Sequence, residues 1–543
     1  MMKTMNNILR NSSVLLVLFI TLSFSACTDF FIVDTKDVLD HTEYIDEESE
    51  MYSGFIGIMT RVQNIGDKII YITDTRGELL EPTINSPKEL YSIYNYDDDL
   101  TDNHYADPAG YYDVIIACND YLLKLYEYKE NNLSSINMNH YEGLVSSTLR
   151  IKAWVYLTLG KIYGEAIWFD DPMRELKDIS QFQLMDLDEI VTASKTLLTN
   201  GFDGVNGKHS IPWKEWLDPY TPTADSPYRY WDSMTPEYFA LYAELCLWSG
   251  DYQTTVNLIL NEMNSVFAST VNDATQYLRN ARMTGGYSGI WNNMNPLPQE
   301  TVSAIIYDYS KNQTNDLLRH FGSENPNEYL LAPSEVGIDR FYDTEFNPLG
   351  SSSADNRANI TFGTNSSGDN VIRKFRPNAS VRPYAYQDDV HIYIYRAADL
   401  YFMLAEALNN LGRDVEASAL INQGVNGSFP NGGVTWAGFT DDWTSASTIG
   451  SRKYPDLGVR GVFQLGNRQF EFGNTKENDL AILDEMMLEF PSEGRIYPAM
   501  IRIAKRYNDY NIIADRVVPK YSNPEEIRTK ILNGGYFINW DLK

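Results

Sequence analysis

The chain has few of the residues from which disulfide frameworks and metal sites are built. Its 543 residues include three cysteines and six histidines. Cys118 and Cys246 stand in apolar, helix-like surroundings, where a free cysteine behaves as a small buried hydrophobe, and a pairing between them stays open. No two histidines have metal-ligand spacing, so no metal site is predicted. The acidic run at residues 97–99 and Asp102 resembles a calcium loop only loosely, because the Gly and terminal Glu of an EF-hand are missing.

Basic residues and catalytic motifs are also scarce. The chain has 44 Lys and Arg against 74 Asp and Glu, a net charge of −30. Nucleic acid and anionic lipid surfaces need clustered Lys and Arg, so this charge disfavours both and fits a neutral or cationic ligand. No P-loop, dinucleotide fingerprint or G-x-S-x-G elbow appears. A carboxylate pair for glycoside hydrolysis could be assembled from so many acids, but their number carries almost no information. The sequence predicts neither catalysis nor a cofactor.

Long apolar runs are missing after the N-terminus, where no stretch reaches the 18 residues of a membrane-spanning helix. The N-terminus has two basic residues, then an apolar run at residues 14–22, then Ser25 and Ala26 directly before Cys27. This order is typical of a secretory signal peptide, and a cysteine behind small residues fits a bacterial lipoprotein box. We expect residues 1–26 to be removed and Cys27 to be acylated, which anchors the protein in a membrane through lipid. An ordinary signal peptide with a chance cysteine is the alternative.

Two segments, at residues 236–259 and 395–422, repeat one pattern of helix, turn and helix. In both, an Ala-Glu pair precedes a turn, with the alanine seven positions before the glycine (Gly250 and Gly412). Apolar residues recur at helical spacing before the second of these glycines, and glycine is a good helix stop. A pair of helices around a glycine turn is the tetratricopeptide unit of roughly 34 residues. The predicted fold is therefore mainly α, with tetratricopeptide-like helix pairs that form a scaffold with large irregular loop insertions.

The rest of the chain alternates between periodic and polar segments. Further helices are predicted at residues 48–62, 111–128, 142–163, 479–490 and 496–506. Long Gly-, Asn-, Ser- and Pro-rich segments lie at residues 86–107, 201–232, 282–298, 324–373 and 424–473. No Gly/Ser linker separates them, so residues 27–543 are interpreted as a single large domain whose loops bind a ligand.

Aromatic residues are abundant in these polar segments, within a total of 38 tyrosines and ten tryptophans. Sugar rings present flat C–H faces that pack on aromatic rings, while their hydroxyls need Asn and Asp partners. The first predicted ligand-binding residues are Tyr91, Tyr94, Tyr96 and Asn103, and the second are Tyr287 and Trp291. Four more candidates would be tested next: Trp213, Trp216, Trp436 and Trp443. The alternative is that these rings only pin loops to the scaffold.

Four motifs are shared with one known family. They are CTDFFIVD from Cys27, the helix from residue 149 to the Tyr-Gly stop at 163–164, the YRAADLYFMLAEALN segment from Tyr395, and the Leu-Glu, Glu-Gly and Arg series ending at Arg502. In this order they resemble the motifs of the SusD/RagB-type outer-membrane lipoproteins of Bacteroidetes. The last motif departs from the family, because Ile496 and Ala499 stand where Arg and Asp are expected.

The resemblance implies a mainly helical lipoprotein in the outer membrane that faces the cell exterior. It implies that the protein binds oligosaccharides and delivers them to a TonB-dependent, SusC-like β-barrel transporter. A peptide-binding import lipoprotein of the RagB type is the alternative, and a surface glycoside hydrolase or a scaffold that binds only proteins is a weaker one. Ligand residues of the family lie in variable loops, so none transfers to this chain by matching.

Overall fold

The computed structural model describes residues 45, 47–100, 102–173, 181–200, 202–204, 207–209, 231–267, 286–291, 300–376, 382–422 and 458–539. The chain divides into two compact units, Met1–Met51 and Tyr52–Lys543. Cys27 and the tryptophans at positions 213, 216, 436 and 443 lie outside the described residues. Whether residues 27–543 form a single domain stays a prediction.

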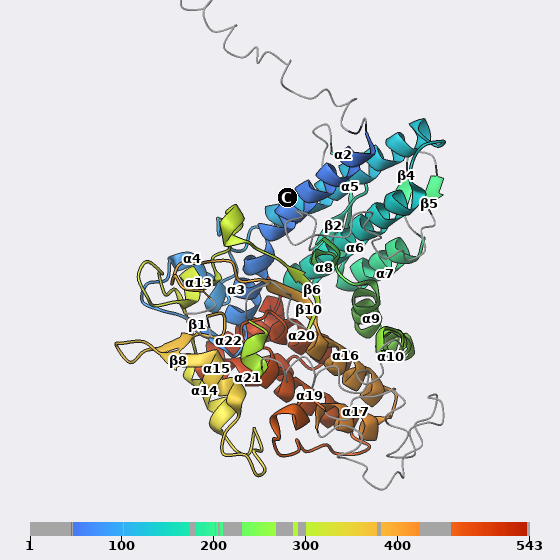
Figure 1. Ribbon diagram of the computed structural model, residues 1–543. Coiled ribbons are helices and arrows are strands. Elements are labelled where there is room, and N and C mark those ends of the chain that lie inside the picture. The colour runs from blue at the N-terminus through green and yellow to red at the C-terminus, as the bar shows by residue number, and fades with distance from the viewer. Residues whose placement is uncertain are drawn as a thin grey trace, which may run out of the picture. The chain divides into compact units, whose positions relative to one another are not determined.

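Helices make up most of the second unit, and the predicted mainly α fold is confirmed (Figure 1). The longer helices are α2 (Glu48–Gln63), α3 (Gly66–Arg76), α5 (Ala109–Asn131), α6 (Met138–Tyr163), α7 (Leu187–Asn200), α9 (Tyr238–Trp248), α10 (Tyr252–Phe267), α16 (Ala397–Asn410), α19 (Thr475–Glu489) and α20 (Ile496–Tyr507). The shorter ones are α4 (Lys88–Tyr94), α8 (Trp231–Met234), α12 (Gly286–Gly289), α13 (Leu317–Phe321), α14 (Glu335–Tyr342), α15 (Asn356–Thr361), α17 (Asp414–Ile421), α21 (Asn511–Val517) and α22 (Pro524–Lys530).

Short helical turns and antiparallel strand pairs complete the described secondary structure. The turns are η4 (Tyr309–Lys311), η6 (Gly461–Phe463), η7 (Val518–Lys520) and the π-helical η8 (Ile531–Gly535). The strand pairs are β1 (Leu80–Pro82) with β7 (Leu331–Pro333), β2 (Glu165–Trp168) with β3 (Gln183–Asp186), β4 (Phe202–Gly204) with β5 (Gly207–His209), β6 (Thr301–Ile305) with β10 (Ile392–Arg396), and β8 (Phe362–Thr364) with β9 (Asn370–Ile372).

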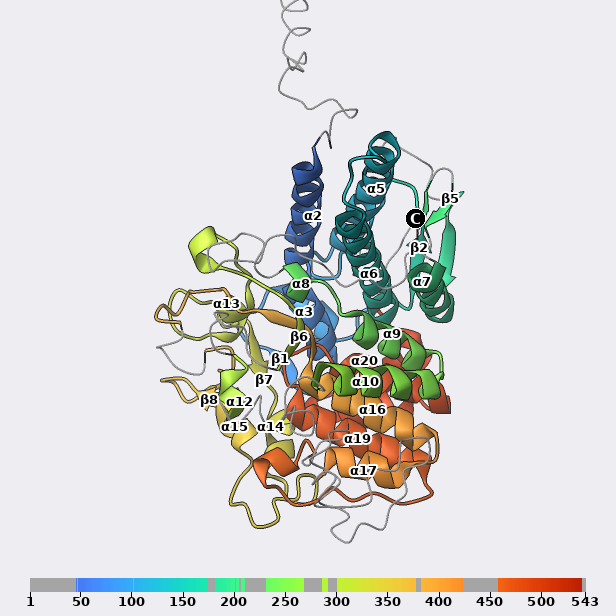
Figure 2. The ribbon, with the colours of Figure 1, turned by 45° about the vertical axis from the view of Figure 1, so that its right-hand side comes forward.

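The helix pairs form a continuous stack in which each helix packs on the next. Helix α5 packs on α6, α6 on α7, α7 on α9, α9 on α10 and α10 on α16. Helix α16 in turn packs on both α17 and α19. Figure 2 shows α10, α16, α19 and α17 as successive layers. The predicted turns are present, because Gly250 and Gly412 have φ of 75° and 74°, a conformation that suits glycine. Gly160 allows α7 to approach α6, since an added Cβ would lie 2.7 Å from a methyl carbon of Leu187.

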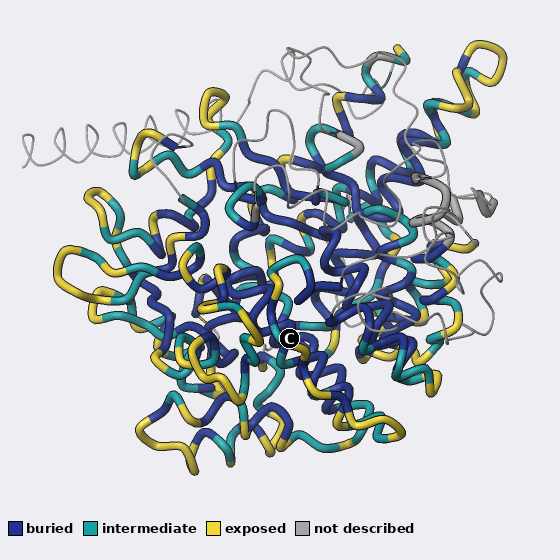
Figure 3. The backbone as a smooth tube through the Cα atoms, turned by 60° about the horizontal axis from the view of Figure 1, so that its bottom comes forward, coloured by how far each residue is buried: buried dark blue, intermediate teal, exposed yellow. Residues whose placement is uncertain are grey.

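All five of the further predicted helices are present, and they correspond to α2, α5, α6, α19 and α20. The prediction of irregular structure for residues 86–107 and 324–373 is wrong in part. The first segment contains α4 and the second contains α14, α15 and short strands. These elements have three to eight residues, too few for a periodic pattern to stand out. Figure 3 shows that exposed residues gather at loops and helix ends around a buried interior.

The family-like motifs hold helices together in the interior. Arg396, directly before α16, contacts carboxylates of Glu489 and Glu493 at 2.8 and 2.9 Å. Glu406 of α16 pairs with Arg502 of α20 at 2.7 Å. Arg495 pairs with Asp399 at 3.1 Å, so the ion pair of this turn is made one position before the residue at which the family has its arginine. Among the described residues, no helix is both long and apolar enough to cross a membrane.

Candidate functional site

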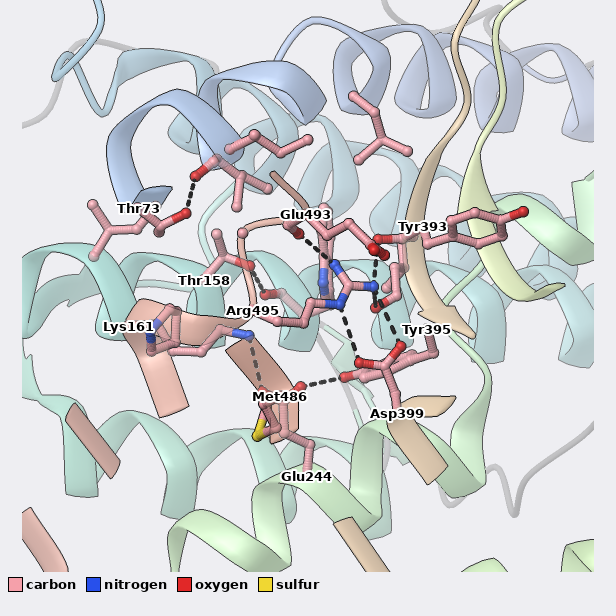
Figure 4. Close-up of a pocket in the computed structure, with 18 of the residues that line it drawn as sticks. Thr73, Thr158, Lys161, Glu244, Tyr393, Tyr395, Asp399, Met486, Glu493 and Arg495 are labelled. Atoms are coloured by element: carbon pink, nitrogen blue, oxygen red, sulfur yellow. Dashed lines mark hydrogen bonds and ion pairs between the residues drawn. The ribbon is translucent and has the colours of Figure 1, made fainter. Parts of the chain in front are cut away.

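A small cavity lined by both apolar and charged side chains lies inside the scaffold, between α3, α6, α9, β10 and α16 (Figure 4). Its charged groups are already paired with one another. Lys161 Nζ contacts Glu244 Oε1 at 2.9 Å, and the hydroxyl of Tyr395 donates to Glu244 Oε2 at 2.6 Å. Burial would raise the pKa of Glu244, but Lys161 and Tyr395 hold it below its ordinary value. Arg495 and Asp399 face each other on another wall.

This cavity suits a few water molecules better than a saccharide. Its volume is about 80 Å³, whereas ligand pockets usually measure roughly 300–1,000 Å³. The ion pairs that line it belong to the family-like motifs. We therefore assign the cavity to the stability of the scaffold and not to ligand binding.

A much larger groove of about 650 Å³ lies beside α3. Asp67, Lys68 and Tyr71 of α3 form one side, and α13 with its flanking residues forms the other. His104 and Tyr105, from the loop before α5, also line it. The antiparallel pair of β1 and β7 joins the two sides, and Figure 1 shows α3, α4, α13 and β1 close together. Segments more than 200 residues apart in sequence thus build one surface.

The floor of the groove is a fixed set of aromatic rings. The rings of Tyr71 and His320 stack with centroids 4.3 Å apart. His320 Nδ1 lies 2.8 Å from the carbonyl oxygen of Asp316, which can only accept, so Nδ1 carries the proton. Burial lowers the pKa of His320, which keeps the ring neutral at pH 7. Its Nε2 therefore accepts a hydrogen bond from the hydroxyl of Tyr105 at 3.0 Å.

Charged side chains around this floor differ in whether they already have partners. Asp67 accepts hydrogen bonds from the backbone N–H of Asp316 at 2.9 Å and from the hydroxyl of Tyr71 at 3.3 Å. Burial raises the pKa of Asp67 to about 6, and these two donors oppose that rise. Arg319 Nε donates to Glu328 at 2.9 Å. Among the described residues, Lys68 has neither a hydrogen-bond nor an ion-pair partner, so its ammonium group is free for a ligand.

The imidazole of His104 adds an exposed ring at the groove, with its centroid 4.0 Å from that of Tyr105. The groove therefore combines an exposed aromatic ring with the free ammonium group of Lys68. This combination suits a polyhydroxylated ligand, which needs both kinds of contact. Within the described part of the chain, no group of three or more His, Cys, Asp or Glu is placed to hold a metal ion.

No residue of the first predicted group lines the groove. Asn103 is buried and shapes the loop, because its Oδ1 accepts from the backbone N–H of Tyr105 at 3.1 Å. Tyr91 is exposed and donates to the carbonyl of Thr83 at 2.8 Å. The ring of Tyr94 lies against that of Tyr521, and Tyr96 is buried under Arg76.

The second predicted group lies in the interior on other elements. Tyr287 is buried and donates to the carbonyl of Glu489 at 2.7 Å. Trp291 is buried against Phe375, with the ammonium of Lys374 4.3 Å from its ring. The structure thus places Asn103 in contact with the groove residue Tyr105, while Tyr287 and Trp291 contact different elements. A ligand contact by any of the six residues stays a prediction.

Sequence reasoning missed most of the residues that line the groove. Tyr105 carried a signal, since it belongs to the same aromatic run as Tyr91 and stands two positions after Asn103. Asp67, Tyr71 and His320 carried none, because the sequence does not reveal that α3 and α13 meet.

The helix stack with its loop-built groove defines a helical-repeat fold of the SusD-like type. A model of the SusD family matches residues 299–533, which include the motifs at Tyr395 and Arg502, so the predicted resemblance to this family is confirmed for that part of the chain. No curated protein matches the sequence.

Solved structures show the same fold over most of the chain. A SusD superfamily protein from Bacteroides vulgatus is 12% identical with a TM-score of 0.62, and the match covers 91% of this chain and 95% of that one. NanU from B. fragilis is 15% identical with a TM-score of 0.55, covering 87% and 92%. A laminarin-binding SusD-like protein is 13% identical with a TM-score of 0.54, covering 91% and 98%. At these identities the likeness establishes the fold alone.

Proposed function

We propose that the protein is a cell-surface lipoprotein that binds an oligosaccharide in the groove and delivers it to a TonB-dependent outer-membrane transporter. The groove carries this proposal, because it sets the exposed ring of His104 beside the free ammonium group of Lys68. A sugar ring would pack its C–H face on the exposed ring of His104, which Tyr105 supports from below, and Lys68 would donate to its hydroxyls. The laminarin-binding relative supports this choice of ligand class.

Binding without turnover is the expected activity. The charged groups of the groove serve mainly to fix its walls, since Arg319 engages Glu328 and Asp67 accepts from two donors. Saturable binding of purified protein to one member of a panel of polysaccharides, without a change in the glycan, would support the proposal. Release of shorter sugars would favour the hydrolase instead. Binding of peptides but of no glycan would favour a RagB-type function.

Two variants, one inside the groove and one outside it, test whether the glycan binds in this groove. The double variant Lys68→Met/His104→Ala should bind the identified glycan roughly 5- to 100-fold more weakly, since it removes one charged donor and one stacking ring. Phe472→Ala is a control, because Phe472 is an exposed ring that does not line the groove. Equal affinity of the double variant and the wild type would show that the ligand binds elsewhere.

Delivery requires a channel, because a protein tethered by lipid alone cannot carry a sugar across a membrane. The partner we propose is a SusC-like TonB-dependent barrel. Gentle detergent extraction from native cells should recover a large β-barrel protein together with this chain. Recovery of the chain alone under several mild conditions would contradict this part of the proposal.

A further inference from the structure

Three tyrosines with exposed rings gather outside the groove. They are Tyr309 in η4 and Tyr384 and Tyr386 in the loop before β10, with exposed fractions of 36%, 53% and 43%. The rings of Tyr384 and Tyr386 are nearly parallel, at 15°, with centroids 5.3 Å apart. The ring of Tyr309 lies 6.4 Å from that of Tyr386. We call these three residues the tyrosine platform.

The platform differs from the tyrosines that pin loops to the scaffold. Tyr91, Tyr163 and Tyr287 each donate a hydrogen bond to a backbone carbonyl. Among the described residues, the hydroxyls of the three platform tyrosines have no hydrogen-bond partner. Their rings contact one another and solvent, so interior packing does not account for their position.

The loop that carries Tyr384 and Tyr386 is fixed to the walls of the groove. Asn327 Nδ2 donates to the carbonyl of Ala385 at 2.8 Å, and Asn327 immediately precedes Glu328 of the groove. The backbone N–H of Asn315, another groove residue, donates to the carbonyl of Asp388 at 3.0 Å. The loop of Tyr384 and Tyr386 is therefore joined directly to a wall of the groove through Asn315.

A buried arginine, Arg382, anchors this loop to the interior through hydrogen bonds. Arg382 Nε donates to Asp389 at 2.8 Å, and its Nη1 donates to the carbonyl of Trp291 at 2.9 Å. These bonds set the loop before any ligand arrives, which lowers the ordering cost of binding. Trp291 thus supports the platform through its backbone and not through its ring.

From this geometry we propose that the tyrosine platform is a second binding surface, on which a saccharide chain that leaves the groove stacks its next pyranose rings. The inference rests on the proposed function of the groove. Stacked, half-exposed phenol rings suit the C–H faces of uncharged sugars, and their free hydroxyls suit sugar hydroxyls. If the platform binds sugar rings, the ligand is a saccharide chain that is long enough to extend beyond the groove.

A protein partner fits the platform less well. A fully buried aromatic side chain contributes about 150–250 Å², and these rings are only half exposed. Three of them offer far less than the roughly 800 Å² per partner of a specific protein interface. A chain of sugar rings, in contrast, needs only a narrow line of aromatic faces.

The test compares saccharides of different length. Laminarin and its oligosaccharides from the disaccharide upward are the first probes, and a glycan found by the panel supplies the corresponding series. The double variant Tyr384→Ala/Tyr386→Ala should bind the longest saccharide roughly 5- to 150-fold more weakly and the shortest bound one as the wild type does. Tyr384→Phe/Tyr386→Phe should lose much less, because the rings remain. Tyr342→Ala, at another exposed tyrosine, is the control.

Each outcome separates the platform from the groove. Equal affinity of the alanine variant and the wild type for the longest saccharide overturns the platform and leaves the groove untouched. An equal loss at every length also overturns it, because a stacking surface beyond the groove cannot act on the shortest ligand. Wild-type protein that binds no saccharide contradicts the proposed function itself. Tyr309→Ala, with an unchanged melting temperature, repeats the test outside the loop of residues 384–389.

Discussion

Arg396 is completely buried and yet charged, because carboxylates of Glu300, Glu489 and Glu493 surround its guanidinium at 2.5 to 2.9 Å. Burial alone would lower the pKa of this arginine, but the three acids hold it well above its ordinary value. Correspondingly, burial would raise the pKa of Glu493, but Arg396 and Lys374 lower it to about 2. These charges depend on one another, so no member can be removed alone without leaving an unpaired charge in the interior.

The first prediction follows from that dependence. Arg396→Met should destabilise the protein by about 3–5 kcal/mol, the usual result of removing one partner from a buried ion pair. Lys505→Gln is the control, because the Lys505–Asp188 pair is exposed and such pairs contribute at most about 1 kcal/mol. Denaturant unfolding measures both. A loss of less than about 1 kcal/mol for Arg396→Met would contradict this account of the cluster.

Asp67 provides a pH-dependent prediction within the groove. Burial raises its pKa from 3.8 to about 6. The folded state therefore holds the proton to a higher pH than the unfolded chain does. The buried, charged carboxylate therefore lowers the free energy of unfolding. This loss of stability is absent below pH 4, grows between pH 4 and 6, and is complete above pH 6. A shift of this size corresponds to about 3 kcal/mol.

Asp67→Asn removes the charge and keeps an oxygen that can accept from the backbone N–H of Asp316. The unfolding free energy of the variant should therefore rise relative to that of the wild type, by about 3 kcal/mol, as the pH increases from 4 to 7. Urea unfolding at several pH values measures this difference. Parallel pH profiles for the two proteins would show that Asp67 titrates alike in the folded and unfolded states.

The residues of the groove show where sequence reasoning ends. Aromatic residues beside Asn and Asp predicted a region, and Asn103 does hold the backbone of Tyr105 at the groove. Whether such a residue supports the loop from inside or is exposed to a ligand is decided by its burial. Burial in turn depends on which segments pack together. His320 lies in the short helix α13, and only the fold brings its ring within 4.3 Å of that of Tyr71, a residue almost 250 positions earlier.

At the level of elements, the glycine turns were predictable because each has a local cause. A turn between antiparallel helices needs a positive φ, and Gly250 and Gly412 supply it. The periodic helices were predictable for a similar reason, since an apolar stripe needs no knowledge of its partner. Helix α4 was missed, because seven residues beside Pro87 and Asn95 make no stripe.

Two glycines should respond to alanine in opposite directions. At Gly412, φ is 74° and no atom would approach an added Cβ, so the cost is purely conformational. Gly412→Ala should therefore destabilise the protein by about 1–2 kcal/mol. Gly57 lies inside α2 with ordinary space around it, so Gly57→Ala should stabilise by about 0.5–1 kcal/mol. Thermal melting checks both, and shifts of the same sign would contradict the assignment of Gly412 to a left-handed turn.

For the molecule as a whole, the proposed role in import requires that the protein be attached to the membrane. The attachment that we propose depends on Cys27. That residue follows a basic, apolar and small-residue order typical of a lipoprotein signal. Several acyl chains on one cysteine, each contributing about 0.8 kcal/mol per buried methylene, would hold the protein firmly.

Cys27→Ala should therefore move the protein out of the membrane fraction or leave it unprocessed, because the acyl acceptor is gone. The wild type should stay in the membrane fraction after a high-salt wash and should carry a lipid mass at its N-terminus. Cys118→Ala is the matched control, since that thiol is buried in α5 and should not affect attachment. A Cys27→Ala protein that is processed and fractionates like the wild type would show that something other than this cysteine holds the protein at the membrane.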